Sequence, residues 1–238
     1  MTGGRAKRLL LPALCVLGLV LFGALGIWQL ERRVWKLDLI QRVKQRVSAP
    51  ARDLSSASEW PSSNSASFEY RRVTVTGALR HGRETLVDAL TERGPGWWVI
   101  TPLQTESGTI LVNRGFIPPE RAAPATRKTG QVTGPVRIEG LLRLTEPRGR
   151  VLRPNRPDQN RFYSRDVAAI ARARDLSEVA PFFIDAGARP NPGGLPVGGM
   201  TVVRFRNAHL VYALTWFGLA ALCLAGLALT IRDAQGRR

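Results

Sequence analysis

The sequence predicts a membrane protein of the α+β class, in which two transmembrane helices flank a β-rich extracytoplasmic domain with one or two short helices. Two runs, residues 9–30 and 207–231, contain no Asp, Glu, Lys or Arg. Each is long enough to cross a bilayer, which takes roughly 20 apolar residues. Between them, residues 68–206 contain short alternating segments bounded by Gly or Pro, a pattern typical of a mostly antiparallel sheet or a small barrel.

The first uncharged run has two interpretations. Ala24-Leu25-Gly26 has the small-x-small pattern of a signal-peptide cleavage site. The apolar run continues past it through Ile27 and Trp28, which makes it longer than the apolar core of a usual signal peptide and favours a retained transmembrane helix.

Residues 31–48 predict an amphipathic, basic helix that continues from the first span. Their apolar positions recur every three or four residues, which is helical spacing, and are Leu30, Val34, Leu37, Ile40, Val43 and Val47. The helix is expected to end before Ala49-Pro50, where a Ser-rich loop, residues 55–67, follows.

The central region predicts a series of strands with one helix among them. The expected strands are 70–76 (ending at Gly77), 85–89, 97–103, 109–116, 136–144, 182–184 and 200–205. Ser164 is expected to cap a short helix that ends at Ala173, and residues 187–199 form a Gly/Pro loop.

The short basic tails, residues 1–8 and 232–238, predict that both termini are cytoplasmic under the positive-inside rule. The segment between the spans, residues 31–206, is then extracytoplasmic. Its own basic charge does not oppose this, because segments longer than roughly 60 residues are translocated largely regardless of charge.

The charge of the molecule indicates an anionic partner. Without the tails, the chain has 29 basic and 17 acidic residues, a net charge of +12. Outside the cytoplasm we expect no nucleic acid, and membrane lipids with anionic headgroups or an acidic protein or cofactor are better partners. A genome that favours Arg is the alternative explanation. The two cysteines, Cys15 and Cys223, both lie in the spans, where a role as small buried residues is expected.

The central region shows no pattern typical of an enzyme. It contains one histidine, His81 beside Gly82, which is expected in a turn and has no cysteine to form a zinc site with it. No glycine-rich phosphate loop or nucleophile motif is present. Asn113-Arg114-Gly115 is interpreted as a tight turn at a strand end, with Gly115 supplying a backbone angle that would be strained for another residue and Arg114 an ion pair, although a binding site is the alternative.

Three stretches give the chain a resemblance to a known family. They are Gly26-Ile27-Trp28-Gln29-Leu30, Val112-Asn113-Arg114-Gly115-Phe116-Ile117-Pro118 and Asn207-Ala208-His209-Leu210-Val211-Tyr212-Ala213-Leu214-Thr215-Trp216-Phe217. In order and sequence they resemble the Surfeit locus protein 1 family of cytochrome c oxidase assembly factors. Two positions depart from its pattern, because Ala208 stands where the family usually has Asn and Phe116 where it usually has Trp.

The resemblance implies two membrane helices, a β-rich outer domain and a bacterial inner-membrane protein that matures the haem a-containing core subunit of the oxidase. It also implies contact with the machinery that synthesises haem a. In bacterial members the histidine of the last motif is implicated in haem a binding, and here it corresponds to His209, which would ligate the haem iron.

The residues around His209 suit a haem site in principle. If both termini are cytoplasmic, Trp28 and Gln29 lie at about the depth of His209, and Tyr212 and Trp216 share its helix face. Arg204 and Arg206 are placed to pair with propionates. A structural interpretation remains open, since aromatic residues form belts at membrane interfaces and a histidine at a helix start can reach interfacial water.

The sequence therefore predicts a non-enzymatic protein that binds haem a transiently and delivers it to, or stabilises, the oxidase core subunit. The alternative is a membrane-anchored interaction scaffold for oxidase subunits that binds no haem.

Overall fold

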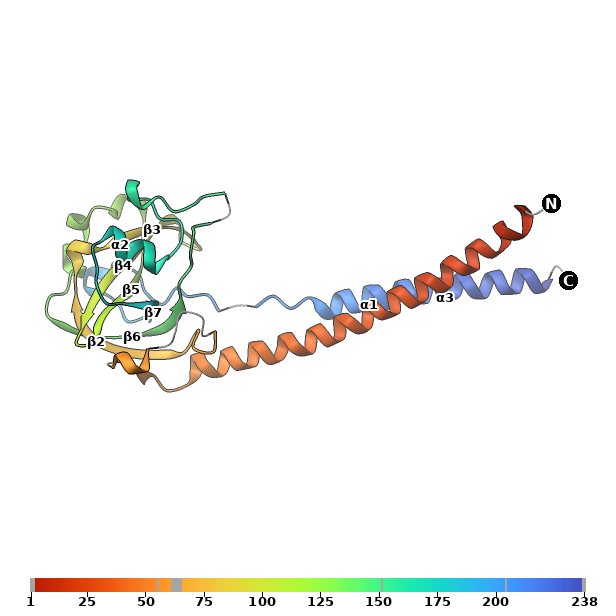
Figure 1. The fold of residues 1–238 in the computed structure, drawn as a ribbon, viewed down its shortest axis with the longest axis horizontal. Helices are drawn as coiled ribbons and strands as arrows, with labels where there is room; N and C mark the ends of the chain where they lie inside the picture. The colour runs from red at the N-terminus through yellow and green to blue at the C-terminus, as the bar shows by residue number, and fades with distance from the viewer. Residues whose placement is uncertain (1–2, 55, 61–65, 151, 204, 237–238) are drawn as a thin grey trace. The chain divides into compact units, whose positions relative to one another are not determined.

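The computed structural model describes residues 3–54, 56–60, 66–150, 152–203 and 205–236. The chain forms two compact units. One consists of residues 1–42 and 204–238 and is made of long helices, and the other, residues 43–203, is a β-rich domain (Figure 1). The predicted combination of two apolar helices with a β-rich domain is confirmed.

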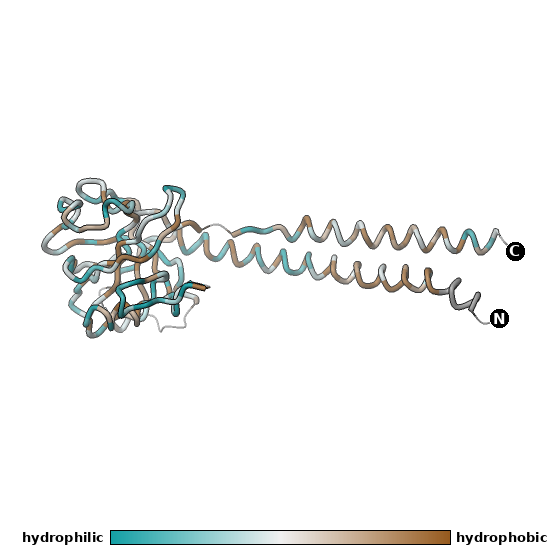
Figure 2. The backbone as a smooth tube through the Cα atoms, turned by 90° about the horizontal axis from the view of Figure 1, so that it is seen from above, coloured by the Kyte–Doolittle hydropathy of each residue, from teal (hydrophilic) through white to brown (hydrophobic). Residues whose placement is uncertain are grey.

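Two helices make up the first unit, α1 (Gly3–Ser48) and α3 (His209–Gly236). Both are long and apolar enough to cross a membrane. A single continuous helix covers both residues 9–30 and residues 31–48, and Figure 2 shows its colour change from hydrophobic to hydrophilic between the two segments. Val34 and Leu37, two of the apolar positions that recur at helical spacing in residues 31–48, are exposed within this unit.

Small residues let α1 and α3 approach each other closely. A Cβ atom at Gly26 would lie 2.5–2.8 Å from the ring of Phe217, and one at Gly18 would lie 2.7 Å from Sγ of Cys223. Cys15 contacts Gly226 in the same way, so each cysteine faces a glycine of the other helix. Such small-residue contacts are the usual basis of helix packing in lipid, where no hydrophobic effect drives helices together.

The second unit is a seven-stranded sheet, five strands of which close into a barrel. The described strands are β1 (Arg52–Asp53), β2 (Arg72–Leu79), β3 (Thr85–Thr91), β4 (Gly94–Thr105), β5 (Gly108–Ile117), β6 (Pro135–Leu144) and β7 (Val179–Ala186). Of these, β1 and β3 pair outside the ring. The sheet order is β1-β2-β6-β7-β5-β4-β3, and an additional pairing of β2 with β4 closes the ring. Pairing is antiparallel except for β1 with β2 and β5 with β7, so the prediction of a mostly antiparallel small barrel is confirmed.

The barrel has an apolar core on each side of its wall. Alternation along β7 places Phe182 and Ile184 in one cluster, with Leu103, Ile110 and Val112. Phe183 belongs to a second cluster that includes Ile170 of helix α2 (Val167–Ala173). The two faces of β7 are therefore both buried, which explains why its sequence is a continuous apolar run rather than an alternating one.

Three sequence-based expectations about local structure were wrong. The strand expected at 200–205 is absent from its described residues, since hydrogen bonding to the sheet ends earlier, with Val197 bonded to Phe116 and Gly199 to Ala186. Strand β2 continues past Gly77, because this glycine allows the backbone of Gln104 on β4 to approach.

The third concerns the start of α2. Asp166 caps this helix by accepting a hydrogen bond from the backbone N–H of Ala169. Ser164 instead donates its hydroxyl to the backbone oxygen of Glu146 and accepts from the N–H of Gly149, which ties two loops together.

Candidate functional site

The structure places His209 and Gln29 in direct contact. His209 is the first residue of α3, Gln29 lies midway along α1, and both belong to the helical unit. Nδ1 of His209 lies 2.8 Å from Oε1 of Gln29. Residues 180 positions apart in the sequence thus form one polar pair between two apolar helices.

This contact orients the imidazole ring and assigns the role of Nδ1. An amide oxygen only accepts hydrogen bonds, so Nδ1 of His209 carries the proton and donates it to Gln29. In the neutral ring with this donor, Nε2 holds the lone pair, and no hydrogen bond to Nε2 is made by any residue that the structure describes. A neutral ring with one nitrogen anchored and the other free is the form in which histidine binds a metal.

The predicted aromatic neighbours of His209 differ in their surroundings. Trp28 and Tyr212 are 52% and 54% exposed, so both rings present open apolar surface. Trp216 stacks on Phe22 of α1, with ring centroids 5.7 Å apart, so its ring contributes to packing of the two helices. Sequence spacing predicts which face of a helix a residue occupies. Whether its ring is buried depends on the residues that the neighbouring helix places against that face, as Phe22 does for Trp216.

The segment just before α3 carries the predicted arginines. Arg206 is exposed, whereas Arg204 lies outside the described residues. Between them, the ring of Phe205 receives the ammonium of Lys36, which lies 5.4 Å from its centroid. Oδ1 of Asn207 is buried without a hydrogen-bond partner among the described residues, which leaves an unsatisfied acceptor two positions before His209.

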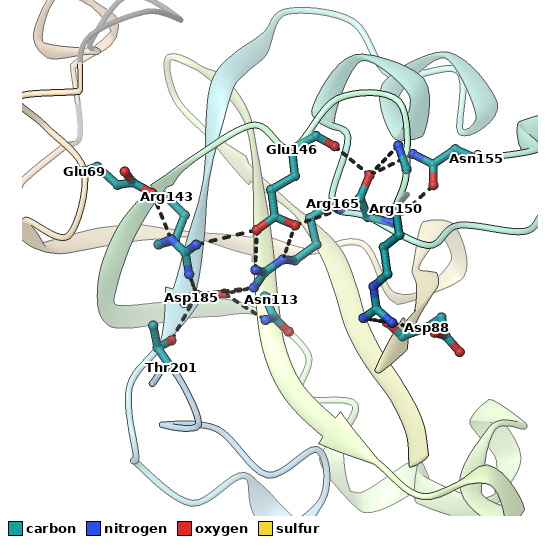
Figure 3. A network of polar contacts seen from close by, with 12 residues as sticks. Glu69, Asp88, Asn113, Arg143, Glu146, Arg150, Asn155, Arg165, Asp185 and Thr201 are labelled. Carbon is teal, nitrogen blue, oxygen red and sulfur yellow. Dashed lines mark hydrogen bonds and ion pairs between the residues drawn. The ribbon is translucent and has the colours of Figure 1, made fainter. Parts of the chain in front are cut away.

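In the barrel unit, a buried carboxylate gathers four hydrogen-bond donors (Figure 3). Asp185 of β7 accepts bonds from Asn113 (2.8 Å), Arg143 (2.9 Å), Arg165 (3.1 Å) and Thr201 (2.9 Å). The donors come from four different segments, and Asp185 is only 3% exposed. This network fixes the positions of β5, β6, β7 and the segment that leads towards α3.

Glu146 extends the same network. It pairs with Arg165 and Arg143, and Arg143 also contacts Glu69 (Figure 3). Burial alone would raise the pKa of Glu146, but hydrogen bonds and positive charge from Arg165 outweigh it and lower that pKa. The carboxylate of Glu146 is therefore held ionised and paired with arginines, an arrangement that holds a fold together rather than one that moves protons.

Sequence reasoning missed this network. Its one sequence signal is Asp185 itself, a carboxylate directly after the apolar run Phe182-Phe183-Ile184. An ionised side chain at a buried strand position requires paired partners, although their identity is not encoded locally.

The interpretation of Asn113-Arg114-Gly115 as a strand-end turn was wrong. All three residues lie within β5 and are buried. Gly115 does adopt a positive φ of 128°, because the backbone oxygen of Val197 occupies the space of a side chain. Arg114 has no ion pair among the described residues and instead hydrogen-bonds Gly130, Asn191 and His81.

His81 begins a 3-10 turn, His81–Arg83, directly after β2, as its Gly82 neighbour indicated. Its Nε2 lies 2.9 Å from the backbone oxygen of Val132 and donates to it. Burial lowers the pKa of His81, and the charge of Arg114 adds to this effect. In the described part of the chain, no group of three or more His, Cys, Asp or Glu side chains is placed to hold a metal ion.

Comparison with known proteins gives consistent matches over most of the chain. The SURF1 family model matches residues 16–221. Surfeit locus protein 1 of Homo sapiens is 40% identical over 215 residues, covering 83% of this chain and 69% of that protein. The SURF1-like protein of Monosiga brevicollis is 38% identical over 227 residues, covering 90% and 84%. The matched region includes both Gln29 and His209, together with the complete barrel.

Proposed function

The chain belongs to the SURF1 family, and from this premise we propose that it is a non-enzymatic assembly factor for cytochrome c oxidase. In this proposal, α1 and α3 anchor it in a bacterial inner membrane, with both termini cytoplasmic and the barrel extracytoplasmic. Its partners are the oxidase core subunit, the machinery that synthesises haem a, and membrane lipids.

We further propose that the chain binds haem a through Nε2 of His209. The observation that carries this proposal is the 2.8 Å contact between His209 and Gln29. Metal-binding histidines usually donate their second ring N–H to an oxygen acceptor, which fixes the tautomer and orients the ring. Gln29 supplies that acceptor, so the free lone pair on Nε2 is available to iron.

The surroundings also fit a flat, amphiphilic group. The rings of Trp28 and Tyr212 are half-exposed on the same two helices and offer apolar surface to a macrocycle. Arg206 and, by its sequence position, Arg204 provide guanidinium groups that match propionates as two-pronged donors. His209 would be the residue that holds the haem, with its Nε2 as a ligand to the iron.

A single protein ligand suits a factor that must release its cargo. Gln29 orients the ring of His209 through Nδ1 and does not contact Nε2. Trp28 and Tyr212 are about half exposed, so the site is accessible from one side. The oxidase core subunit can then compete for the haem by offering its own ligands.

The test is an absorption spectrum of the protein purified in detergent from cells that make haem a. We expect a haem a spectrum in the wild type and its loss in His209→Ala. Gln29→Leu, which removes the acceptor, should weaken haem binding by about 10- to 100-fold. Gln29→Glu keeps an acceptor at the same position and should retain the haem, and Leu210→Ala serves as a neighbouring control.

Two results would contradict haem binding by His209. One is a haem a spectrum that survives His209→Ala at equal yield. The other is the absence of haem in the wild type while oxidase subunits still co-purify, which would establish the alternative of an interaction scaffold.

A further inference from the structure

The barrel contains a buried guanidinium group that the fold only partly satisfies. Arg114 is 3% exposed and lies on β5. Its Nη2 donates to the backbone oxygen of Gly130 and to Oδ1 of Asn191 (3.0 Å), and its Nη1 lies 3.4 Å from Nδ1 of His81. A guanidinium has five N–H groups, so two of them have no acceptor in the described part of the chain.

Arg114 also lacks a counter-ion. Among the described residues, no carboxylate lies within ion-pair distance of it, and the nearby Glu84 is already paired with Arg127. Burial lowers the pKa of Arg114 to about 10, so the group remains charged at neutral pH. A buried charge without a partner is costly, and a native fold usually supplies either a counter-ion or a ligand.

Arg114 forms part of the wall of a cleft of about 790 Å³. Two further arginines on this wall, Arg137 and Arg189, are exposed and have no ion pair among the described residues. The one carboxylate on the wall, Glu139, is paired with Arg72. The cleft therefore has three positive charges that no described carboxylate neutralises.

The rest of the wall is largely apolar. Its apolar members are Val47 of α1, Leu79 of β2, Val132 just before β6, Val136 and Ile138 of β6, and Pro190 after β7. A purely inorganic anion would leave the apolar wall of the cleft in contact with water. A ligand with an apolar body and one charged end would cover it and also reach the arginines.

We propose that this cleft binds an organic carboxylate, with its charged end at the guanidinium of Arg114 and its apolar body against the β2–β6 wall. Arg137 and Arg189 add attraction at the rim. The site belongs entirely to the barrel unit, so it is independent of haem binding at His209.

The test measures binding of radiolabelled hexanoate to the full-length protein in a non-ionic detergent by equilibrium dialysis at low salt. The decisive variant is Arg137→Gln/Arg189→Gln, which removes two exposed charges without touching the core. Its matched control is Arg93→Gln/Arg172→Gln, which removes two exposed arginines outside the cleft. Unlabelled hexanol, which has the same tail and no charge, serves as the competitor control.

We expect saturable binding that hexanol does not displace, about fivefold weaker in the cleft variant and unchanged in the control variant. Arg114→Lys keeps the charge but loses the planar fork, so binding should weaken about tenfold in protein that unfolds at the wild-type temperature. If Arg114→Lys does not fold, the exposed pair alone decides.

Equal binding by the cleft and control variants, or displacement by hexanol, would overturn the proposal. Arg114 would then serve only to hold the loops that contain Gly130 and Asn191.

Discussion

Replacing Asp185 with Asn should destabilise the barrel strongly, although the two side chains have nearly the same shape. The substitution removes the negative charge that receives bonds from Arg143 and Arg165, and it turns one acceptor into an N–H donor. That new donor would face groups that are themselves donors, including Asn113 and Thr201. The loss therefore combines a broken ion pair with unsatisfied hydrogen bonds.

The size of the effect follows from what the arginines retain. Removing one partner of a buried ion pair costs about 3–5 kcal/mol. Arg165 and Arg143 both keep Glu146, and Arg143 also keeps Glu69, so the lower end of this range applies, about 3 kcal/mol. For a domain of this size, that loss lowers the unfolding temperature by roughly 6–12 °C.

Thermal unfolding of the full-length protein in detergent, followed by near-ultraviolet circular dichroism, measures this shift. Asp88→Asn is the matched control, because Asp88 pairs with Arg150 at 3.0 Å while the two side chains are 30% and 45% exposed. An exposed pair contributes about 0–1 kcal/mol, so this variant should unfold near the wild-type temperature. If the two variants unfold together, the Asp185 network does not hold the barrel as argued.

Three further outcomes follow from the structure. Gly26→Leu would force its side chain into the ring of Phe217 and should separate α1 from α3. The expected result is a loss of haem binding while the unfolding temperature of the barrel stays unchanged. Gly115→Ala should lower barrel stability by more than about 1 kcal/mol in the same melt, because alanine adopts a positive φ poorly and the carbonyl of Val197 fills the space. Stability should also fall as the pH drops below about 6.5, since the lowered pKa of His81 makes the unfolded chain bind the proton first. Above that pH the stabilisation is complete, and His81→Gln should show a flatter pH dependence of the unfolding temperature.

The sequence predicted the parts of the fold that depend on local patterns. Six of the expected strands correspond to β2 through β7, because alternation and bounding Gly or Pro residues reflect each strand's own two faces. The sequence left open whether the strands form an open sheet or a closed barrel. Closure depends on the pairing of Ala78 and Leu79 with Gln104 and Leu103, and no local sequence pattern indicates a contact between such distant residues.

The candidate site, too, was only partly predictable from the sequence. From the sequence, Gln29 and His209 were expected at a similar membrane depth if both termini are cytoplasmic, and the structure places the two side chains 2.8 Å apart. The stacking of Trp216 on Phe22 did not follow, because rotation of each helix about its axis is set by glycines on the neighbouring helix. The Asp185 network draws on four separate segments, so its members became recognisable only when folded.

The position of β7 has a consequence for synthesis of the chain. This strand lies between β6 and β5 in the ring, yet it is the last strand to be made. Until Ala186 has emerged, β5 and β6 each present an unpaired edge, and such edges invite pairing with other chains. A nascent chain that stalls before residue 179 would therefore expose two unpaired strand edges that favour aggregation. Completion of β7 would cover both edges.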